Sequence, residues 1–106
     1  MYTAIREYKM TAGSVDDLMH KVDVGIADVF AGQEGFLRYE VLDVGDGRIV
    51  SVTTFTDRAS AQESNELASD FVHNELREFG LARTAARTGE VMVSRAGANL
   101  LEPIHH

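Results

Sequence analysis

Two strand-like runs, Phe36–Val44 and Arg48–Thr56, carry apolar side chains at both odd and even positions. Because side chains alternate across a strand, a sheet built from these runs has two faces that avoid water. Alternation separates the apolar residues of each run into opposed sets: Leu37, Tyr39 and Val41 against Phe36 and Leu42, and Val50 and Val52 against Ile49 and Phe55.

The rest of the chain predicts only two helices, which can cover one face of this sheet. A second copy of the chain is the economical cover for the other face. The pattern therefore predicts a homodimer, and the parity of the second run predicts that Ile49 and Phe55 face the partner.

A capping-box motif predicts where the first helix begins. A break at Thr11–Gly13 follows a strand-like run, Tyr2–Met10, and Ser14 then precedes Asp17 by three residues. This is a capping-box spacing, in which the Ser14 hydroxyl accepts from a free helix N–H. One continuous helix is expected, with these apolar positions on its buried stripe: Val15, Leu18, Val22, Ile26 and Val29, widened by Met19 and Phe30.

The second half of the chain contains a hairpin, a helix and a final strand. Gly45–Gly47, with Asp-Gly at its centre, predicts a tight turn between the two-sided strands. Asp57 is placed to cap a helix over Arg58–Phe79. Leu81–Arg87 reads as a connector, and Glu90–Arg95 returns to the period of two that is typical of a strand.

The resulting order, β-α-β-β-α-β, is ferredoxin-like. Right-handed crossovers place both helices on one face of a four-stranded antiparallel sheet, so the predicted fold class is α+β. Residues 1–96 are expected to form this single domain, and 97–106 a tail. His105 and His106 are either native or the remnant of a tag, so no site is based on them.

Composition excludes several functions. The net charge of −7 disfavours nucleic acid and anionic membranes, which bind through clustered Lys and Arg. No apolar stretch approaches the roughly 20 residues that span a bilayer. The chain has no Cys and no paired-imidazole spacing, so we expect no metal site. The absence of Cys also fits a reducing cytoplasmic location.

Short motifs in a fixed order resemble a known family. Met10 ends the first strand ahead of Gly13, Gly35-Phe36 enters the second, Tyr39-Glu40-Val41 continues it, and Phe55-Thr56-Asp57 precedes the second helix. Over about Tyr2–Arg95, the chain resembles the antibiotic biosynthesis monooxygenase-like group of dimeric α+β barrel proteins. The resemblance implies a homodimer of the fold predicted above. Members of the wider superfamily include cofactor-independent oxygenases of aromatic polyketides, haem-degrading enzymes, small isomerases and proteins with no known activity.

Two departures from the family pattern concern activity. Family enzymes often carry Trp-x-[Asp/Ser] where this chain has Phe55-Thr56-Asp57, and the chain contains no tryptophan. Many carry a His about nine residues later, where this chain has Ser64-Asn65. The missing Trp argues against the haem-degrading subgroup.

Charged and polar residues on the central strands have two interpretations. Arg6, Tyr8 or Arg38 can line a cavity and orient a phenolate or carboxylate. Alternatively, Arg6 with Glu40, or Arg38 with Glu7, can form salt bridges at the dimer interface. The ion-pair interpretation is the commoner outcome for strand charges.

Other candidates also have two interpretations. His73 in the second helix is a candidate general base or a half-exposed helix residue. Asn65 and Ser64 either donate to a ligand oxygen or face water, and His20 forms a surface pair with Asp16 rather than a metal site. The predicted catalytic residues are His73, Tyr8 and Arg6, and the predicted substrate contacts are Arg38, Tyr39, Phe36, Phe55, Asn65 and Met92.

The leading functional prediction is oxygenation of a small aromatic phenol, quinol or polyketide-like substrate without metal or flavin. A non-catalytic ligand-binding or stress-associated dimer is one alternative, and an isomerase or cyclase is another.

Overall fold

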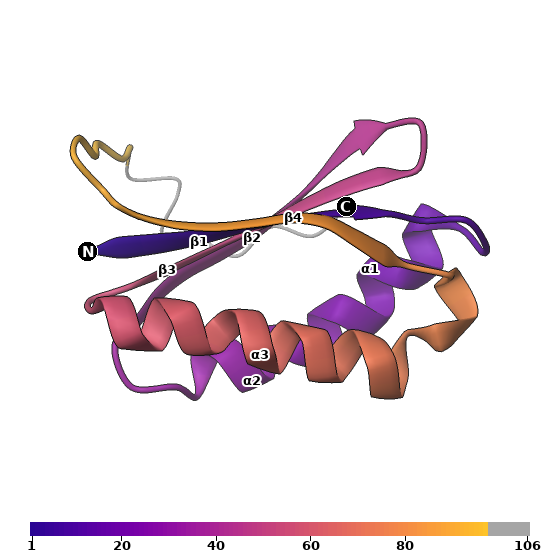
Figure 1. Cartoon of the computed structure of the whole chain (residues 1–106), viewed down its shortest axis with the longest axis horizontal. Helices are drawn as coiled ribbons and strands as arrows, with labels where there is room; N and C mark the ends of the chain where they lie inside the picture. The colour runs from indigo at the N-terminus through magenta and orange to yellow at the C-terminus, as the bar shows by residue number, and fades with distance from the viewer. Residues whose placement is uncertain (98–106) are drawn as a thin grey trace.

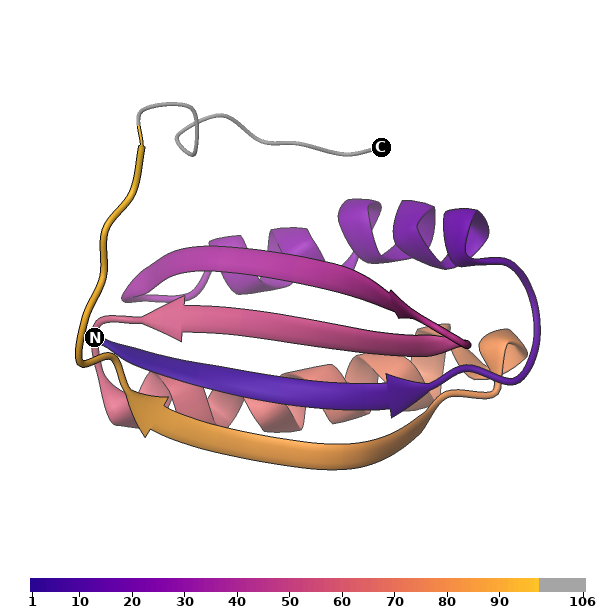
Figure 2. The ribbon, with the colours of Figure 1, turned by 90° about the horizontal axis from the view of Figure 1, so that it is seen from above.

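The computed structural model describes residues 1–97, and its four strands form one antiparallel sheet in the order β2-β3-β1-β4. The helices lie together on one face of this sheet (Figure 1). The other face is seen uncovered in Figure 2. This is the predicted ferredoxin-like α+β fold. The elements are β1 (Tyr2–Lys9), α1 (Val15–Val24), α2 (Ile26–Ala31), β2 (Phe36–Gly45), β3 (Arg48–Phe55), α3 (Arg58–Glu75), the 3₁₀ helix η1 (Arg77–Phe79) and β4 (Ala82–Glu90).

The predicted helix caps are confirmed. The Asp17 N–H donates to Ser14 Oγ over 3.1 Å, and the Ser60 N–H donates to Asp57 Oδ1 over 2.8 Å. Each cap satisfies one of the amide groups that a helix N-terminus leaves free. The second helix is shorter than predicted, because α3 ends at Glu75 and η1 follows it.

The apolar stripe predicted one continuous first helix. The structure instead divides this segment at Gly25 into α1 and α2. A Cβ atom at Gly25 would lie 2.5 Å from Cζ of Phe71, so α3 packs here against bare backbone. The break also changes which residues are buried: Phe30 is 1% exposed, whereas Val29, predicted to share the buried stripe, is 46% exposed.

Strand parity was assigned to the wrong faces in two places. Ile49 and Phe55 lie under the helices, at 4% and 0% exposure, and not on the face left for a partner. Phe36 was predicted to oppose Tyr39, but a register shift between Phe36 and Arg38 places it against the core with Tyr39. Both faces of these strands are apolar, so alternation alone did not identify the covered one.

The uncovered face of the sheet is defined by the residues that alternate with the buried ones. Ile5 of β1 and Leu42 of β2 are 45% and 46% exposed there. Val50 and Val52 of β3 lie between them in the sheet, paired with Leu42 and Ile5 respectively. We call these four residues the open-face patch.

The last strand begins eight residues earlier than predicted. β4 covers Ala82–Glu90, most of which was expected to be a connector, and the chain leaves the sheet where Glu90–Arg95 was expected to form the strand. Val93 is accordingly 85% exposed. β4 pairs only with β1, as an edge strand, and its small and polar side chains produce no apolar alternation. Of the predicted tail, residues 98–106 lie outside the described part of the chain.

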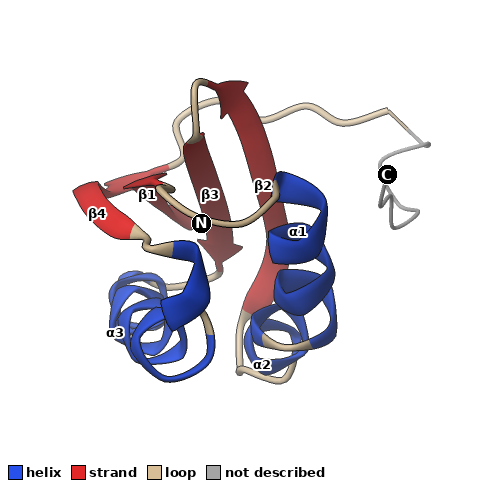
Figure 3. Ribbon diagram, turned by 90° about the vertical axis from the view of Figure 1, so that its right-hand side faces the viewer, coloured by secondary structure: helices blue, strands red, loops and turns tan. Residues whose placement is uncertain are grey.

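The core lies between the sheet and the helices. An end-on view shows α3 beneath β1 and β4, and α1 and α2 beneath β2 (Figure 3). Leu18, Phe30, Ile49, Leu76 and Phe79 are among its most buried members. Within residues 1–97, no helix has the length and apolar character needed to cross a membrane.

Candidate functional site

Arg6 is the most unusual residue of the core. β1 places Ala4, Arg6 and Tyr8 on the covered face, and the Arg6 side chain is 0% exposed. Its guanidinium donates four hydrogen bonds to neutral oxygens: Nε to Ser51 Oγ at 3.0 Å, Nη1 to Ser64 Oγ at 3.0 Å and Asn65 Oδ1 at 3.1 Å, and Nη2 to Thr53 Oγ1.

No carboxylate within residues 1–97 forms an ion pair with this buried cation. The ion pairs within residues 1–97 are Lys21–Glu78, Arg38–Glu40 and Arg48–Glu7, and none involves Arg6. Burial lowers the pKa of Arg6, although an arginine retains its proton in a protein. The Phe30 ring, 5.3 Å from Arg6 Cζ, provides partial compensation through its π-face. Most of the N–H donors of Arg6 therefore have an acceptor. Its positive charge, however, is not balanced by a negative one within residues 1–97.

A cavity of about 40 Å³ lies beside this arginine, between the sheet and the helices. Ser51 and Phe30 form part of its wall and also contact Arg6, so they separate the cavity from the guanidinium. Such a volume holds about two or three water molecules, and a larger ligand requires its walls to move. We call this space the inner cavity.

Two tyrosines face the inner cavity. The hydroxyl of Tyr8 is buried without a hydrogen-bond partner among the described residues. Tyr39 packs edge-to-face on Phe30, with ring centroids 4.9 Å apart, and burial raises the pKa of its phenol. Since an unpaired buried hydroxyl is costly, Tyr8 is the group in this cavity with an unmet need for a polar partner.

A second, larger hollow of about 430 Å³ opens beyond Tyr8, between α3, η1 and the start of β4. We call this hollow the outer cleft. Tyr8, Val72, Leu76 and Leu81 line both spaces and so form a shared wall. His73 lies on the exposed side of α3 and lines only this outer cleft. The outer cleft thus adjoins the inner cavity across this wall.

The structure brings together five of the predicted site residues. Arg6 binds Asn65 directly, and the Asn65 amide donates to Thr88 Oγ1 of β4 at 3.3 Å. Tyr8 and Tyr39 line the inner cavity, and His73 reaches the same region through the outer cleft.

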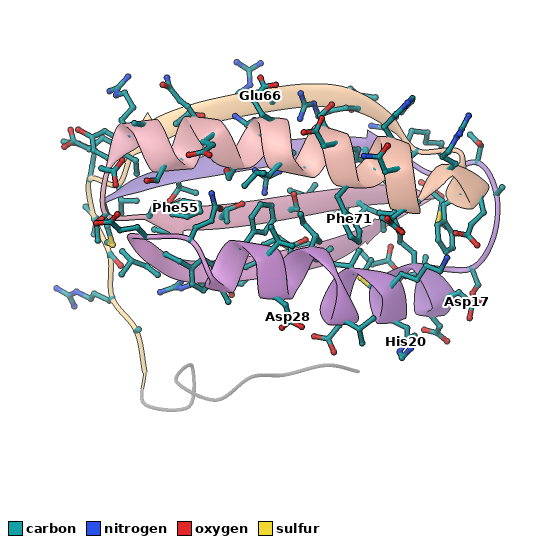
Figure 4. The ribbon with its side chains drawn as sticks, turned by 90° about the horizontal axis from the view of Figure 1, so that it is seen from below. Asp17, His20, Asp28, Phe55, Glu66 and Phe71 are labelled. Atoms are coloured by element: carbon teal, nitrogen blue, oxygen red, sulfur yellow. The ribbon has the colours of Figure 1, made fainter. Side chains whose placement is uncertain are left out.

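The other four predicted contacts lie elsewhere. Phe36 and Phe55 pack edge-to-face, with centroids 5.9 Å apart, and line neither space. Phe55 and Phe71 lie between the helices, whereas Asp17, His20 and Asp28 point away from the core, as the surface interpretation of His20 predicts (Figure 4). Met92 follows β4 and is 81% exposed.

The predicted Arg6–Glu40 salt bridge is wrong, whereas Arg38 and Glu7 have other partners within the chain and a bridge between them across a dimer interface stays a prediction. Arg6 and Glu40 lie on opposite faces of the sheet, and Arg38 pairs with Glu40 at 3.7 Å on the uncovered face. Glu7 pairs instead with Arg48 at 3.6 Å. The charged strand residues therefore divide between a buried site and an exposed surface.

Sequence reasoning missed Ser51, Thr53 and Phe30. The serine and threonine alternate with Ile49 and Phe55 on the covered face of β3, where hydroxyls need a polar partner. That alternation was the available signal, because Arg6 is the charged side chain on the adjacent face of β1. Within residues 1–97, no three acidic or imidazole side chains cluster as metal ligands would.

Comparison with known proteins identifies similar sequences and folds. The family model described as antibiotic biosynthesis monooxygenase matches residues 1–69. Comparison with curated protein sequences found no match.

Several solved structures share the fold. HapK from Hahella chejuensis has a TM-score of 0.62 at 19% identity, covering 92% of this chain and 99% of that one. SnoaB from Streptomyces nogalater, described as a cofactor-independent oxygenase, has a TM-score of 0.58 at 19% identity, covering 90% and 94%. A dimeric ferredoxin-like protein from an uncultured marine organism has a TM-score of 0.61 at 14% identity, covering 92% and 100%. At these identities the similarity shows the fold alone.

Proposed function

This chain belongs to the antibiotic biosynthesis monooxygenase family, and from that premise we propose that it oxygenates a small aromatic phenol or quinol without a metal or flavin. The observation that carries the proposal is the buried Arg6 cation, which has no carboxylate partner within residues 1–97 and lies beside a cavity containing the unpaired Tyr8 hydroxyl. An anionic ligand oxygen in the cavity would satisfy both groups at once.

The proposed role of the site is to hold the substrate as its anion. Tyr8 donates a hydrogen bond to the phenolate oxygen, and Arg6 favours the charged form through its field without touching the ligand. In an interior of low dielectric, a nearby positive charge lowers the pKa of a phenol. Arg6 therefore acts on the substrate through its charge. Ser51, which accepts a hydrogen bond from Arg6, forms part of the wall between Arg6 and the inner cavity.

The chemistry requires no oxidant other than oxygen. A base removes the phenol O–H proton, and the resulting phenolate, which has carbanion character at a ring carbon, supplies the electron pair that forms a carbon–oxygen bond with O₂. Protonation gives a hydroperoxide at that carbon. Loss of the C–H proton from the same carbon with cleavage of the O–O bond then leaves a carbonyl and releases water. His73 is the proposed base, because it and Tyr8 line the same outer cleft.

Oxygen uptake with a panel of anthrones and quinols tests the proposal. Wild type should bind members of the panel and consume oxygen, and Tyr8→Phe should lose about a hundredfold in turnover, the lower end of the effect of removing one donor to a developing oxyanion. Tyr2→Phe is the matched control, since Tyr2 begins the same strand and lines neither space.

Three results would replace the proposal with an alternative. Saturable binding with no oxygen uptake and no product would make the chain a non-catalytic binding protein. Product formation without oxygen uptake would make it an isomerase or cyclase. Binding to no member of the panel would remove the aromatic substrate altogether.

We also propose that the chain works as a homodimer joined through the uncovered face of the sheet. Four apolar side chains, the open-face patch, lie on this face, which no element of residues 1–97 covers (Figure 2). Burying such a patch contributes about 25 cal/mol for each Å² removed from water. A marine protein of the same fold is described as dimeric, which supports a dimer.

A further inference from the structure

We propose that the outer cleft is a binding site for a carboxylate on the substrate, at the end of the molecule opposite its reactive phenol. This inference rests on the proposed function, since it identifies a second recognition element for the same ligand. It names the substrate class as a phenolic or quinolic aromatic acid.

Charge is the first line of evidence. Arg77 of η1 and Arg83 of β4 line the outer cleft together with His73, and no aspartate or glutamate is among its lining residues. Neither arginine belongs to an ion pair within residues 1–97. The whole chain has 17 acidic residues against 10 basic ones, so its net charge is negative. A cleft lined by two arginines and no acidic residue therefore has the opposite sign of charge from the chain as a whole. Arginine favours carboxylates because its planar donors match their geometry.

Arg83 is also held in place by the inner site. Its Nη1 donates to the backbone carbonyl of Asn65 at 2.9 Å, and the side chain of that same Asn65 accepts from Arg6. One residue therefore links the buried cation to the outer one. This leaves the remaining Arg83 donors available to a ligand, in a fixed position relative to the inner cavity.

The shared wall connects the two sites. Tyr8 lines both spaces, and its hydroxyl is the unpaired buried group. The other wall residues are Val72, Leu76 and Leu81, which are apolar. A flat ring passing this wall would contact aliphatic side chains at its middle, Tyr8 at its phenolic end and the two arginines at its acidic end.

Three probes separate the ends of such a ligand. The aromatic acid 6-hydroxy-2-naphthoate carries a phenol and a carboxylate on opposite edges, its methyl ester removes the charge, and 2-naphthol removes the group. Each would be titrated by calorimetry into the wild type and into Arg77→Gln/Arg83→Gln. Arg58→Gln/Arg95→Gln is the matched control, because it removes the same charge from residues that do not line the cleft.

We expect wild type to bind the acid about five- to tenfold more tightly than its ester, the advantage of two partly solvated charge contacts. The double cleft variant should bind acid and ester equally, and the control should keep the wild-type preference. Equal binding of acid and ester by the wild type, or a preference that survives in the cleft variant, would overturn the inference.

The same data distinguish this inference from the proposed function. If naphthol and ester bind and depend on Tyr8 but the acid gains nothing, the phenol site stands and the carboxylate site falls. If the acid alone binds, through Arg77 and Arg83 and with no loss in Tyr8→Phe, the carboxylate site stands and the phenol site falls. If no probe binds, both fall.

Discussion

Replacing Arg6 by methionine should weaken the binding of a phenolic ligand while changing the stability of the fold little. Methionine is unbranched and uncharged, so the substitution removes a fully buried cation that no carboxylate within residues 1–97 accompanies. The effective penalty of burying one ion is several kcal/mol, and the variant regains it.

The lost hydrogen bonds oppose this gain. Ser64 keeps its own bond to the Ala61 carbonyl at 2.6 Å, and Asn65 keeps its bond to Thr88 at 3.3 Å. Ser51 and Thr53 lose the partner that Arg6 provides, at about 1–3 kcal/mol for each buried group. The two contributions are of similar size, so we expect the free energy of unfolding to change by less than about 2 kcal/mol.

Urea unfolding followed by circular dichroism measures the stability, and calorimetry with a phenolic ligand measures the binding. Arg48→Met is the control, because Arg48 is an exposed arginine at the hairpin and its ion pair with Glu7 is worth little. If Arg6→Met lost more than about 4 kcal/mol, Arg6 would be a structural residue of the kind whose removal breaks a buried network. Unchanged ligand affinity in a folded Arg6→Met would equally refute its role in the site.

Three further predictions concern assembly and folding. Val52→Glu should weaken self-association in analytical ultracentrifugation, because it places a charge within the open-face patch; a wild type that is already monomeric at micromolar concentration would contradict the dimer. Gly25→Ala should lower the free energy of unfolding by about 1–3 kcal/mol in urea, because its Cβ would meet the Phe71 ring, and unchanged stability would show that the ring moves freely. Hydrogen bonds from Ser60 lower the pKa of Asp57, so the stability that Asp57 contributes is present above the ordinary aspartate pKa and is lost as the pH falls through the lowered value. The free energy of unfolding of Asp57→Asn should therefore depend less on acid pH than that of the wild type. Identical pH profiles of this free energy for variant and wild type would exclude the effect.

Local signals in the sequence predicted most of the elements. The capping residues Ser14 and Asp57, the Asp-Gly turn and the two apolar runs are all short-range features, and each is where it was expected. The last strand was misplaced because an edge strand pairs on one side only and can be built from alanine and threonine.

The faces of the sheet were harder to predict, for a physical reason. When both faces are apolar, alternation defines two sets of residues but not which set the helices cover. The choice depends on long-range packing, as does the break at Gly25, which is explained only by the Phe71 ring of another helix.

Some residues selected from the sequence lie near one another in the structure, and their roles stay predictions. Tyr8 and Tyr39 line the inner cavity, and Arg6, bonded to Asn65, lies behind its wall. The predicted Arg6–Glu40 bridge was wrong because the parity of β1 places Arg6 under the helices, where the available partners are the hydroxyls of β3 and α3. The β3 hydroxyls could be assigned to Arg6 only after the covered face was known.

The ionisation of a bound phenol tests the central claim most directly. A naphthol saturated with protein would be titrated with base while the absorbance of its phenolate is recorded, alongside the free naphthol. Because Arg6 and Tyr8 both favour the anion, we predict that the bound phenol ionises at a lower pH than the free one, and that Tyr8→Phe reduces the difference. A bound phenol that ionises at the same pH as the free one, or at a higher pH, would contradict the account.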